Sequence, residues 1–277
     1  MPPKTNAIKR RPYRNYKKRY YPKKNVMSVA AVTAIVKKEL HLNTENKFAS
    51  NTLLPTQIPA AIGINTTAGN IFPIMPSIFR GTEPDQRVGS KITPVSLIIK
   101  GYLTLDLNDL DHDYDRVCVR LIAGFAKRYP SSVDALAEIQ DHPNNNWTNK
   151  LVKLGSSDQA FDGTLGALQA PVNRAVFTVK AQKFISMSRP RFYDAALVGS
   201  DGFRESVHST RFFTLKIKCP KTIKFDVDGN AAYPNNFAPV LCAGYALMNG
   251  SNPGYPSEVS PKPVMISYTT RFVYEDA

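Results

Sequence analysis

The chain has 277 residues, with 36 basic and 22 acidic side chains and a net charge of +14. Twelve bases and no acids fall in the first 38 residues, which leaves 24 bases against 22 acids, or +2, for the rest. This split excludes a uniformly basic globular protein and indicates a cationic tail on a nearly neutral body. Three widely spaced cysteines argue against a disulfide framework and for a reducing compartment.

We expect residues 1–25 to form a disordered arm that binds nucleic acid. Like charges repel one another there, and four prolines break up any helix. Each Lys or Arg that contacts a phosphate releases a condensed counterion, and unpaired bases stack on tyrosine rings, so single strands fit best. The candidate nucleic-acid-binding residues are Lys4, Lys9, Arg10, Arg11, Arg14, Lys17, Lys18, Arg19, Lys23, Lys24, Tyr13, Tyr16, Tyr20 and Tyr21.

Two plainer roles for the arm stay open. In the first, the arm is only a solubilising extension. In the second, it is only a nuclear import signal, which short Lys/Arg runs resemble. Recognition by host import receptors can also be a second use of the same residues.

Residues 26–79 are expected to connect the arm to the body. Val29, Val32, Val36 and Leu40 recur at helical spacing and predict a short helix. The apolar run over residues 26–36 is too short to cross a bilayer, so we expect no membrane span. Residues 43–79 are rich in Pro and Asn and show no sustained period.

The body, residues 80–277, has the pattern of an all-β domain. Apolar side chains occupy odd positions from 95 to 107, and the same period of two returns in 117–125, 175–187, 213–217, 223–227 and 264–274. Residues 237–248 are apolar on both faces, which is typical of a central strand. Ser131 and Asp134 open the pattern of one short inserted helix. Together these features predict an antiparallel sandwich, for which the jelly roll is the best-matching size class.

No set of side chains in the sequence has the spacing of a catalytic or zinc site, so we expect neither an enzyme nor a cofactor. Asp109, Asp111 and Asp113 begin like a calcium loop, but Tyr114 stands where that loop needs Gly and Arg120 where it needs Glu. A solvated loop is the better interpretation of residues 106–115, and a cation at a subunit contact stays open.

Basic side chains in the body form a second candidate surface for nucleic acid. Lys216 and Lys218 share one face of a predicted strand, and Arg189 and Arg191 precede two aromatic residues. Ordinary solvated faces are more common than binding surfaces, so this interpretation is the weaker of the two.

The turn before the clearest strand is the most specific motif, and its residues are Gly81, Gln86, Arg87, Gly89 and Lys91. Gly81 and Gly89 permit backbone angles that other residues avoid, and we expect a positive φ at Gly89. Arg87 either braces the turn, bridges subunits or touches DNA.

Residues 78–101, which read IFRGTEPDQRVGSKITPVSLIIKG, resemble the capsid proteins of circular, Rep-encoding single-stranded DNA viruses, the circovirus-like group. The basic, Tyr-rich arm and the chain length also fit that family. The resemblance implies a jelly-roll subunit of a shell of about sixty copies, with the arms turned inward onto a circular single-stranded DNA genome. It further implies a virion protein that enters the host nucleus during assembly.

Two alternatives to the capsid hypothesis belong to other classes. A cellular protein with a basic tail, of the ribosomal or chromatin type, would bind nucleic acid without assembling. A coat protein of a small satellite-type RNA virus would share the arm and the fold, because charge and stacking do not separate DNA from RNA.

Overall fold

The computed structural model describes residues 28–43, 46–62, 70–105, 116–142, 146–188, 209–226, 231–250 and 264–276. The chain divides into two compact units, Met1–Thr44 and Glu45–Ala277. The predicted arm lies outside the described residues, as do Arg189, Arg191 and the aspartate-rich stretch 106–115.

The first unit contains the predicted short helix, α1, which spans Val29–Asn43. Ser28 opens this helix, since its hydroxyl accepts a hydrogen bond from the backbone N–H of Ala31 at 3.2 Å. No helix among the described parts of the chain is long and apolar enough to cross a membrane.

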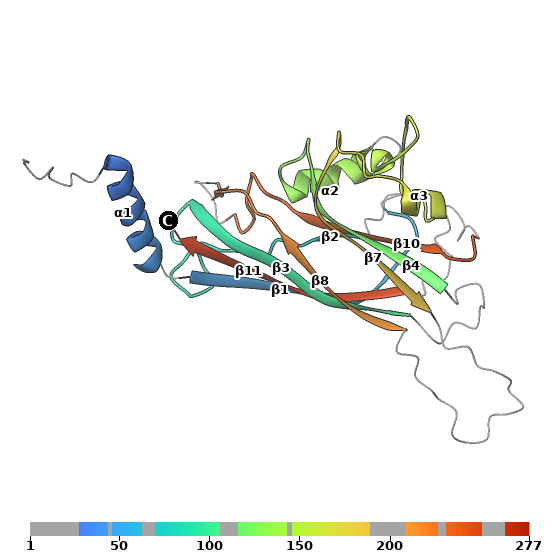
Figure 1. Ribbon diagram of the computed structural model, residues 1–277, viewed down its shortest axis with the longest axis horizontal. Helices are drawn as coiled ribbons and strands as arrows, with labels where there is room; N and C mark the ends of the chain where they lie inside the picture. The colour runs from blue at the N-terminus through green and yellow to red at the C-terminus, as the bar shows by residue number, and fades with distance from the viewer. Residues whose placement is uncertain are drawn as a thin grey trace, which may run out of the picture. The chain divides into compact units, whose positions relative to one another are not determined.

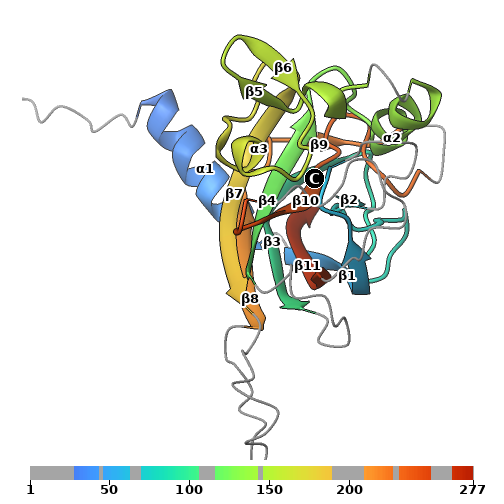
Figure 2. The same ribbon diagram turned by 90° about the vertical axis from the view of Figure 1, so that its right-hand side faces the viewer.

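The second unit is built from two antiparallel sheets (Figures 1 and 2). The first sheet has the order β1-β11-β3-β8, and its strands span Asn46–Ile58, Val264–Asp276, Lys91–Leu105 and Thr210–Ile217. The short strand β9, Ile223–Lys224, pairs with the start of β3. The second sheet has the order β2-β10-β4-β7, and its strands span Ile71–Pro73, Val240–Leu247, Arg116–Ala126 and Phe177–Ser188.

Apart from β9, the eight strands of the two facing sheets pair as a nested set. β1 pairs with β11, β2 with β10, β3 with β8 and β4 with β7, each time antiparallel. The chain alternates between the sheets from β1 to β4, stays in the second sheet for β7, and then returns strand by strand, so β8, β10 and β11 each pair with an earlier strand that lies far away in the sequence.

The main core lies between the two sheets. Leu97 and Phe272 of the first sheet and Val119 and Leu241 of the second belong to one cluster of buried apolar side chains. Leu97, Val119 and Phe272 stand at the alternating positions that the sequence predicts, because a strand with one buried face exposes every second side chain. The predicted central strand is β10, whose residues are all buried.

A second core covers the other face of the second sheet. The segment between β4 and β7 folds over this face as α2 (Ser132–Asp141), a 3₁₀ turn (Thr148–Lys150), β5 (Val152–Leu154), β6 (Ser157–Gln159) and α3 (Leu165–Gln169). Trp147 stacks on Phe177 at 5.4 Å, and its indole N–H donates to the carbonyl of Ala135 at 3.0 Å. The prediction of a helix at 131–140 is confirmed, but a single inserted helix is wrong, because the insertion also contains α3 and a hairpin.

Arg120 of β4 fastens this insertion to the sheet. Its side chain is buried, and Nη1 donates to the carbonyl of Ala167 in α3 at 2.8 Å. The rings of Phe161 and Phe184 flank the guanidinium at 5.9 and 5.3 Å. Burial lowers the pKa of Arg120 to about 10.

The boundary predicted at residue 80 is wrong, because β1 and β2 belong to the sandwich and the second unit starts at Glu45. β1 escaped prediction because it is an edge strand, and only Lys47, Ala49 and Ile58 are buried along it.

The prediction that the apolar side chains of residues 175–187 all face one core is also wrong. A bulge opposite Ala123 and Gly124 turns Phe177 toward the second core, whereas Ile185 and Met187 face the first.

Candidate nucleic-acid interface

The outer face of the first sheet gathers basic side chains from three strands. Arg271 of β11 lies opposite Ile98 of β3, and Ile98 lies opposite Lys216 of β8. In the next row Thr269 lies opposite Lys100, which lies opposite Thr214. Arg271, Lys100 and Lys216 are all exposed, and diagonal neighbours on adjacent strands are about 7–8 Å apart.

Aromatic rings lie beside these cations on the same face. Tyr102 and Phe212 pair across β3 and β8 with ring centroids 6.2 Å apart in an edge-to-face arrangement, and Phe212 is 79% exposed. At the other side of the sheet the Arg271 guanidinium lies 5.7 Å from the ring of the exposed Phe48. Exposed rings flanked by cations suit single strands, because bases stack on the rings while phosphates meet the charges.

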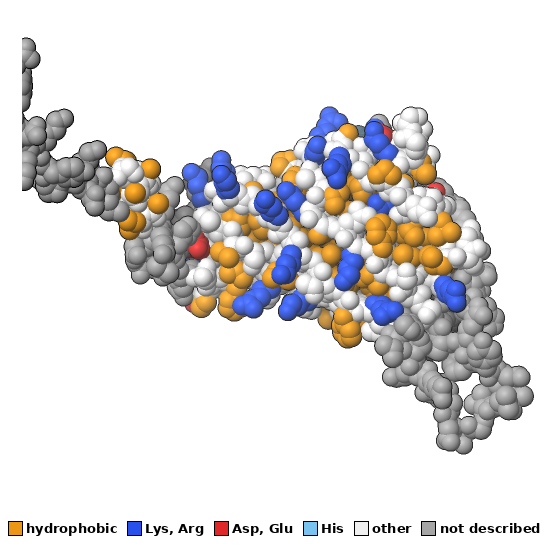
Figure 3. Space-filling model, in the orientation of Figure 1, with side chains coloured by type: hydrophobic (Ala, Val, Ile, Leu, Met, Phe, Trp, Pro, Cys, Tyr) orange, Lys and Arg blue, Asp and Glu red, His pale blue; other side chains and the backbone are white. Residues whose placement is uncertain are grey.

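Acidic side chains are scarce on this sheet. β1, β3 and β8 contain no Asp or Glu, and β11 contains them only at its last two positions, Glu275 and Asp276. Charges of one sign on one face raise the local potential and attract a polyanion. Figure 3, with the edge formed by β7 and β8 in the foreground, shows basic side chains spread over the body and few acidic ones.

A groove of about 310 Å³ opens at one end of this face. It forms because β3 pairs with β9 only up to Ile92 and with β8 only from Leu97 onward. Its lining residues are Pro94, Val95, Ser96, Leu97, Ile98, Lys216, Ile217, Lys218 and Cys219. Lys216 and Lys218, which the sequence places on one strand face, both line this groove. The groove lies beside a β-bulge at the exposed Val95.

Sequence reasoning missed Phe48, Phe212 and Arg271 as members of this surface. One signal was present, since Phe212 and Phe213 are adjacent in a strand and only one of two neighbours can face the core. The cross-strand register that brings Arg271 and Lys216 into one row has no signal in a single sequence.

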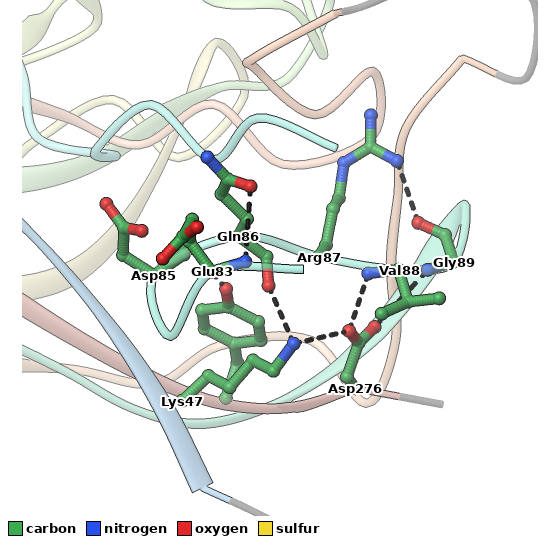
Figure 4. Close-up of polar contacts among 9 residues, drawn as sticks. Lys47, Glu83, Asp85, Gln86, Arg87, Val88, Gly89 and Asp276 are labelled. Atoms are coloured by element: carbon green, nitrogen blue, oxygen red, sulfur yellow. Dashed lines mark hydrogen bonds and ion pairs between the residues drawn. The ribbon is translucent and has the colours of Figure 1, made fainter. Parts of the chain in front are cut away.

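The predicted turn motif is a structural anchor at the start of β3 (Figure 4). Arg87 is buried, and its two terminal nitrogens donate to the carbonyls of Gly89 at 2.7 Å and Ala231 at 3.0 Å. Its guanidinium lies 4.2 Å from the ring centre of Phe225. Of the three roles left open for Arg87, the contacts favour bracing the turn. Burial, followed by the nearby Arg80, lowers the pKa of Arg87.

The other motif residues support the same turn. The backbone N–H of Gly81 donates to the carbonyl of Arg87 at 2.9 Å, and a side chain at Gly81 would collide with the amide of Gln86. Lys91 starts β3 opposite Lys224 and is exposed. A positive φ at Gly89 is wrong, since the described glycines with positive φ are Gly155, Gly163 and Gly250.

The carboxylate of Asp276, at the end of β11, ties this turn to the first strand (Figure 4). It accepts hydrogen bonds from the backbone N–H groups of Val88 at 2.6 Å and Gly89 at 3.4 Å and from Lys47 Nζ at 3.2 Å. Lys47 also donates to the carbonyl of Gln86 at 2.9 Å. The anchor therefore joins β1, the turn and β11.

Metal binding and thiol chemistry have little support in the described part of the body. Within the described ranges, no group of three or more His, Cys, Asp or Glu side chains is placed to hold a metal ion. Cys118 and Cys242 are buried, and burial raises the pKa of the half-buried Cys219 to about 11.

No protein-family model matches this chain, and no curated protein matches its sequence. The case for a function therefore rests on the surface described above and on the charge pattern of the sequence.

Proposed function

We propose that this chain is the coat-protein subunit of a small icosahedral virus of the circovirus-like group. In this proposal the subunit packages circular single-stranded DNA with its basic arm and with the outer face of the sheet β1-β11-β3-β8. The observation that carries the proposal is the strand order. Two facing sheets, each with four strands in nested antiparallel pairs and the first with the short β9 added, are the arrangement expected of a jelly roll, the architecture of many viral shells.

The distribution of charge supports the nucleic-acid part of the proposal. The arm precedes β1 in the sequence, and β1 belongs to the sheet whose outer face combines Lys100, Lys216 and Arg271 with exposed rings. A run of closely spaced cations suits a genome with no fixed path, because each Lys or Arg neutralises whichever phosphate it meets. About sixty arms would bring on the order of 600 positive charges to the genome.

The basic residues of the arm also suggest where in the cell the subunit acts. The subunit is a virion component without catalytic activity, and its arm doubles as an import signal that host nuclear import receptors recognise. Assembly then takes place in the nucleus on newly made single-stranded DNA.

Purification of the full-length protein followed by electron microscopy and sequencing of nuclease-protected nucleic acid tests the proposal. We expect closed particles of uniform size that protect circular single-stranded DNA. A monomer under every salt and pH condition would overturn the coat function and favour a cellular nucleic-acid-binding protein. Particles that protect RNA would overturn the DNA assignment and favour a satellite-type RNA virus.

A further inference from the structure

β1 is the terminal strand of its sheet, so one of its edges has no strand beside it among the described residues. Residues 46–53 pair in unbroken register with β11 on the other side, up to a bulge at residues 54 and 55. A regular free edge of this kind offers a row of backbone donors and acceptors to any strand that reaches it.

The side-chain contacts of β1 show which backbone groups point to the free edge. The N–H of Asn51 donates to the Thr270 hydroxyl, and its carbonyl accepts from the same hydroxyl, both at 3.2 Å. The carbonyl of Leu53 accepts from Ser267 at 3.0 Å. Because backbone groups alternate in direction along an antiparallel strand, those of Phe48, Ser50 and Thr52 point away from β11.

The other sheet edges carry the features that protect natural edges from pairing. β7 contains Lys180 and Lys183, β8 contains Lys216, and β2 is only three residues long. In residues 46–53 the only charged side chain is Lys47, which is buried and paired with Asp276 at 3.2 Å. This edge therefore lacks the exposed charges that discourage edge-to-edge pairing.

A second copy of the chain is the occupant that this edge fits. The outer face of this sheet carries the exposed cations Lys100, Lys216 and Arg271 in every copy, so a contact between copies is best placed on a strip without exposed charge. Two-fold contacts are self-complementary, and a strand edge fulfils that condition when it pairs antiparallel with itself.

Exposed side chains select the register of such a pair. Phe48 is 53% exposed and Leu54 is 75% exposed. If Phe48 lies opposite Leu54 of the second copy, two-fold symmetry creates two equivalent Phe48–Leu54 contacts, and each contact covers both side chains. The same register puts Ser50 opposite Thr52 of the second copy, where the edge-directed groups of both residues exchange hydrogen bonds, and it puts Asn51 on the axis.

We propose that two copies pair antiparallel through β1, about a two-fold axis at Asn51, so that two first sheets become one continuous sheet. This contact rests on the proposed self-assembly of the chain but needs neither nucleic acid nor a closed shell.

Cysteine cross-linking of the full-length chain tests the register. In the proposed dimer the two Asn51 residues form a non-hydrogen-bonded pair with Cα atoms about 4.5 Å apart, within the span of a disulfide. The two Ser50 residues are about 9 Å apart, beyond that span. Under mild oxidation we expect Asn51→Cys to give about tenfold more covalent dimer on a non-reducing gel than Ser50→Cys. Equal yields, or a dimer from Ser50→Cys alone, would overturn the proposal.

A proline variant tests the edge itself. Ser50→Pro removes an N–H that points away from β11, and proline is tolerated on edge strands in that orientation. Sedimentation should show loss of the dimer for Ser50→Pro and its retention for Ser50→Ala, with equal thermal melting. If Ser50→Pro fails to fold, Leu54→Lys provides the same test by adding like charges to the contact. A dimer that survives Leu54→Lys would overturn the proposal.

The outcomes separate this contact from the coat function. Closed particles without an Asn51→Cys cross-link would overturn pairing through β1 and leave the coat function standing. A cross-linked Asn51→Cys dimer that never forms particles, in any salt or pH, would confirm the contact and overturn the coat function.

Discussion

At the scale of single residues, Asp276 ties two segments to the end of β11, because its carboxylate accepts two hydrogen bonds from the turn, at Val88 and Gly89, and one from Lys47 of β1. We expect Asp276→Asn to lower the free energy of unfolding by about 1.5–3 kcal/mol, since hydrogen bonds to a charged group are lost and the buried Lys47 keeps no anion. Urea denaturation measures the change.

Asp158→Asn is the matched control for this substitution. Asp158 pairs with Lys153 at 3.6 Å on the surface, where both side chains are 40–45% exposed. Its loss should change stability by no more than about 0.5 kcal/mol. Equal effects of the two variants would contradict the role given to Asp276.

Tyr274 predicts a dependence of stability on alkaline pH. Burial first, then the nearby Asp276 and Asp85, raise the pKa of Tyr274 to about 12. Between pH 10 and 12 the unfolded chain loses this proton while the folded chain keeps it, so stability falls as the pH rises. We expect Tyr274→Phe to flatten that fall by up to about 1.4 kcal/mol per pH unit.

Below pH 10 the same variant should cost about 0.5–1.5 kcal/mol, because the phenol of Tyr274 donates to the carbonyl of Asp85 at 3.0 Å. Urea denaturation of both proteins from pH 7 to 12 gives the two quantities. An unchanged slope above pH 10 would show that another group causes the alkaline loss.

At the scale of elements, the body should fold without the arm. Its first strand, β1, begins at Asn46, so removal of residues 1–24 takes away no residue of either sheet. We expect the circular dichroism spectrum and the melting temperature of this truncated chain to match those of the full-length protein.

Removal of residues 1–58 is the matched comparison, because it also deletes β1. β11 would then lose the partner that it pairs with over most of its length, and the buried Ala49 and Ile58 would leave the core. We expect this shorter chain to be insoluble or to melt far lower. A sheet signal that collapses after removal of residues 1–24 alone would show that the arm is structural.

How far the sequence predicts the elements depends on how strictly their side chains alternate. β3, β4, β8 and β11 alternate or are apolar over long runs, and the prediction located them. β1 shows only a few buried positions, and the β7 bulge changes which face is buried without changing the period. α3 has five residues, which is too short for a helical period to be recognised.

At the scale of the whole molecule, the candidate interface could be predicted only in part. Charge counting separates the arm from the body, and strand alternation places Lys216 and Lys218 on one face. The row that joins Arg271 to Lys216 depends on β11 and β8 flanking β3, and this strand order arises from long-range pairing. Side-chain pattern reports burial, whereas neighbours across a sheet are set by topology.

The contributions of the arm and of the basic sheet face to nucleic-acid binding can be separated by measuring how affinity depends on salt concentration. If both contact phosphates of a single strand, each neutralised triple should flatten the slope of log affinity against log salt by about 2, at roughly 0.7 per contact. The two triples, changed to Gln in the full-length chain, are Lys17, Lys18 and Arg19 in the arm and Lys100, Lys216 and Arg271 on the sheet. A matched triple outside the sheet, Lys127, Arg128 and Lys153, should leave the slope unchanged.

Stacking should separate from charge in the same titration. Replacing Tyr102 and Phe212 by Ser removes one half-buried and one exposed ring but no charge, so the slope should stay the same while affinity for single strands falls by up to about 1–3 kcal/mol per stacked base. Duplex DNA should respond less, because its bases are already stacked on one another. A fluorescent oligonucleotide titrated with each variant provides the data. If the sheet triple leaves the slope intact while the arm triple flattens it, the arm alone binds the genome and the basic face serves another purpose.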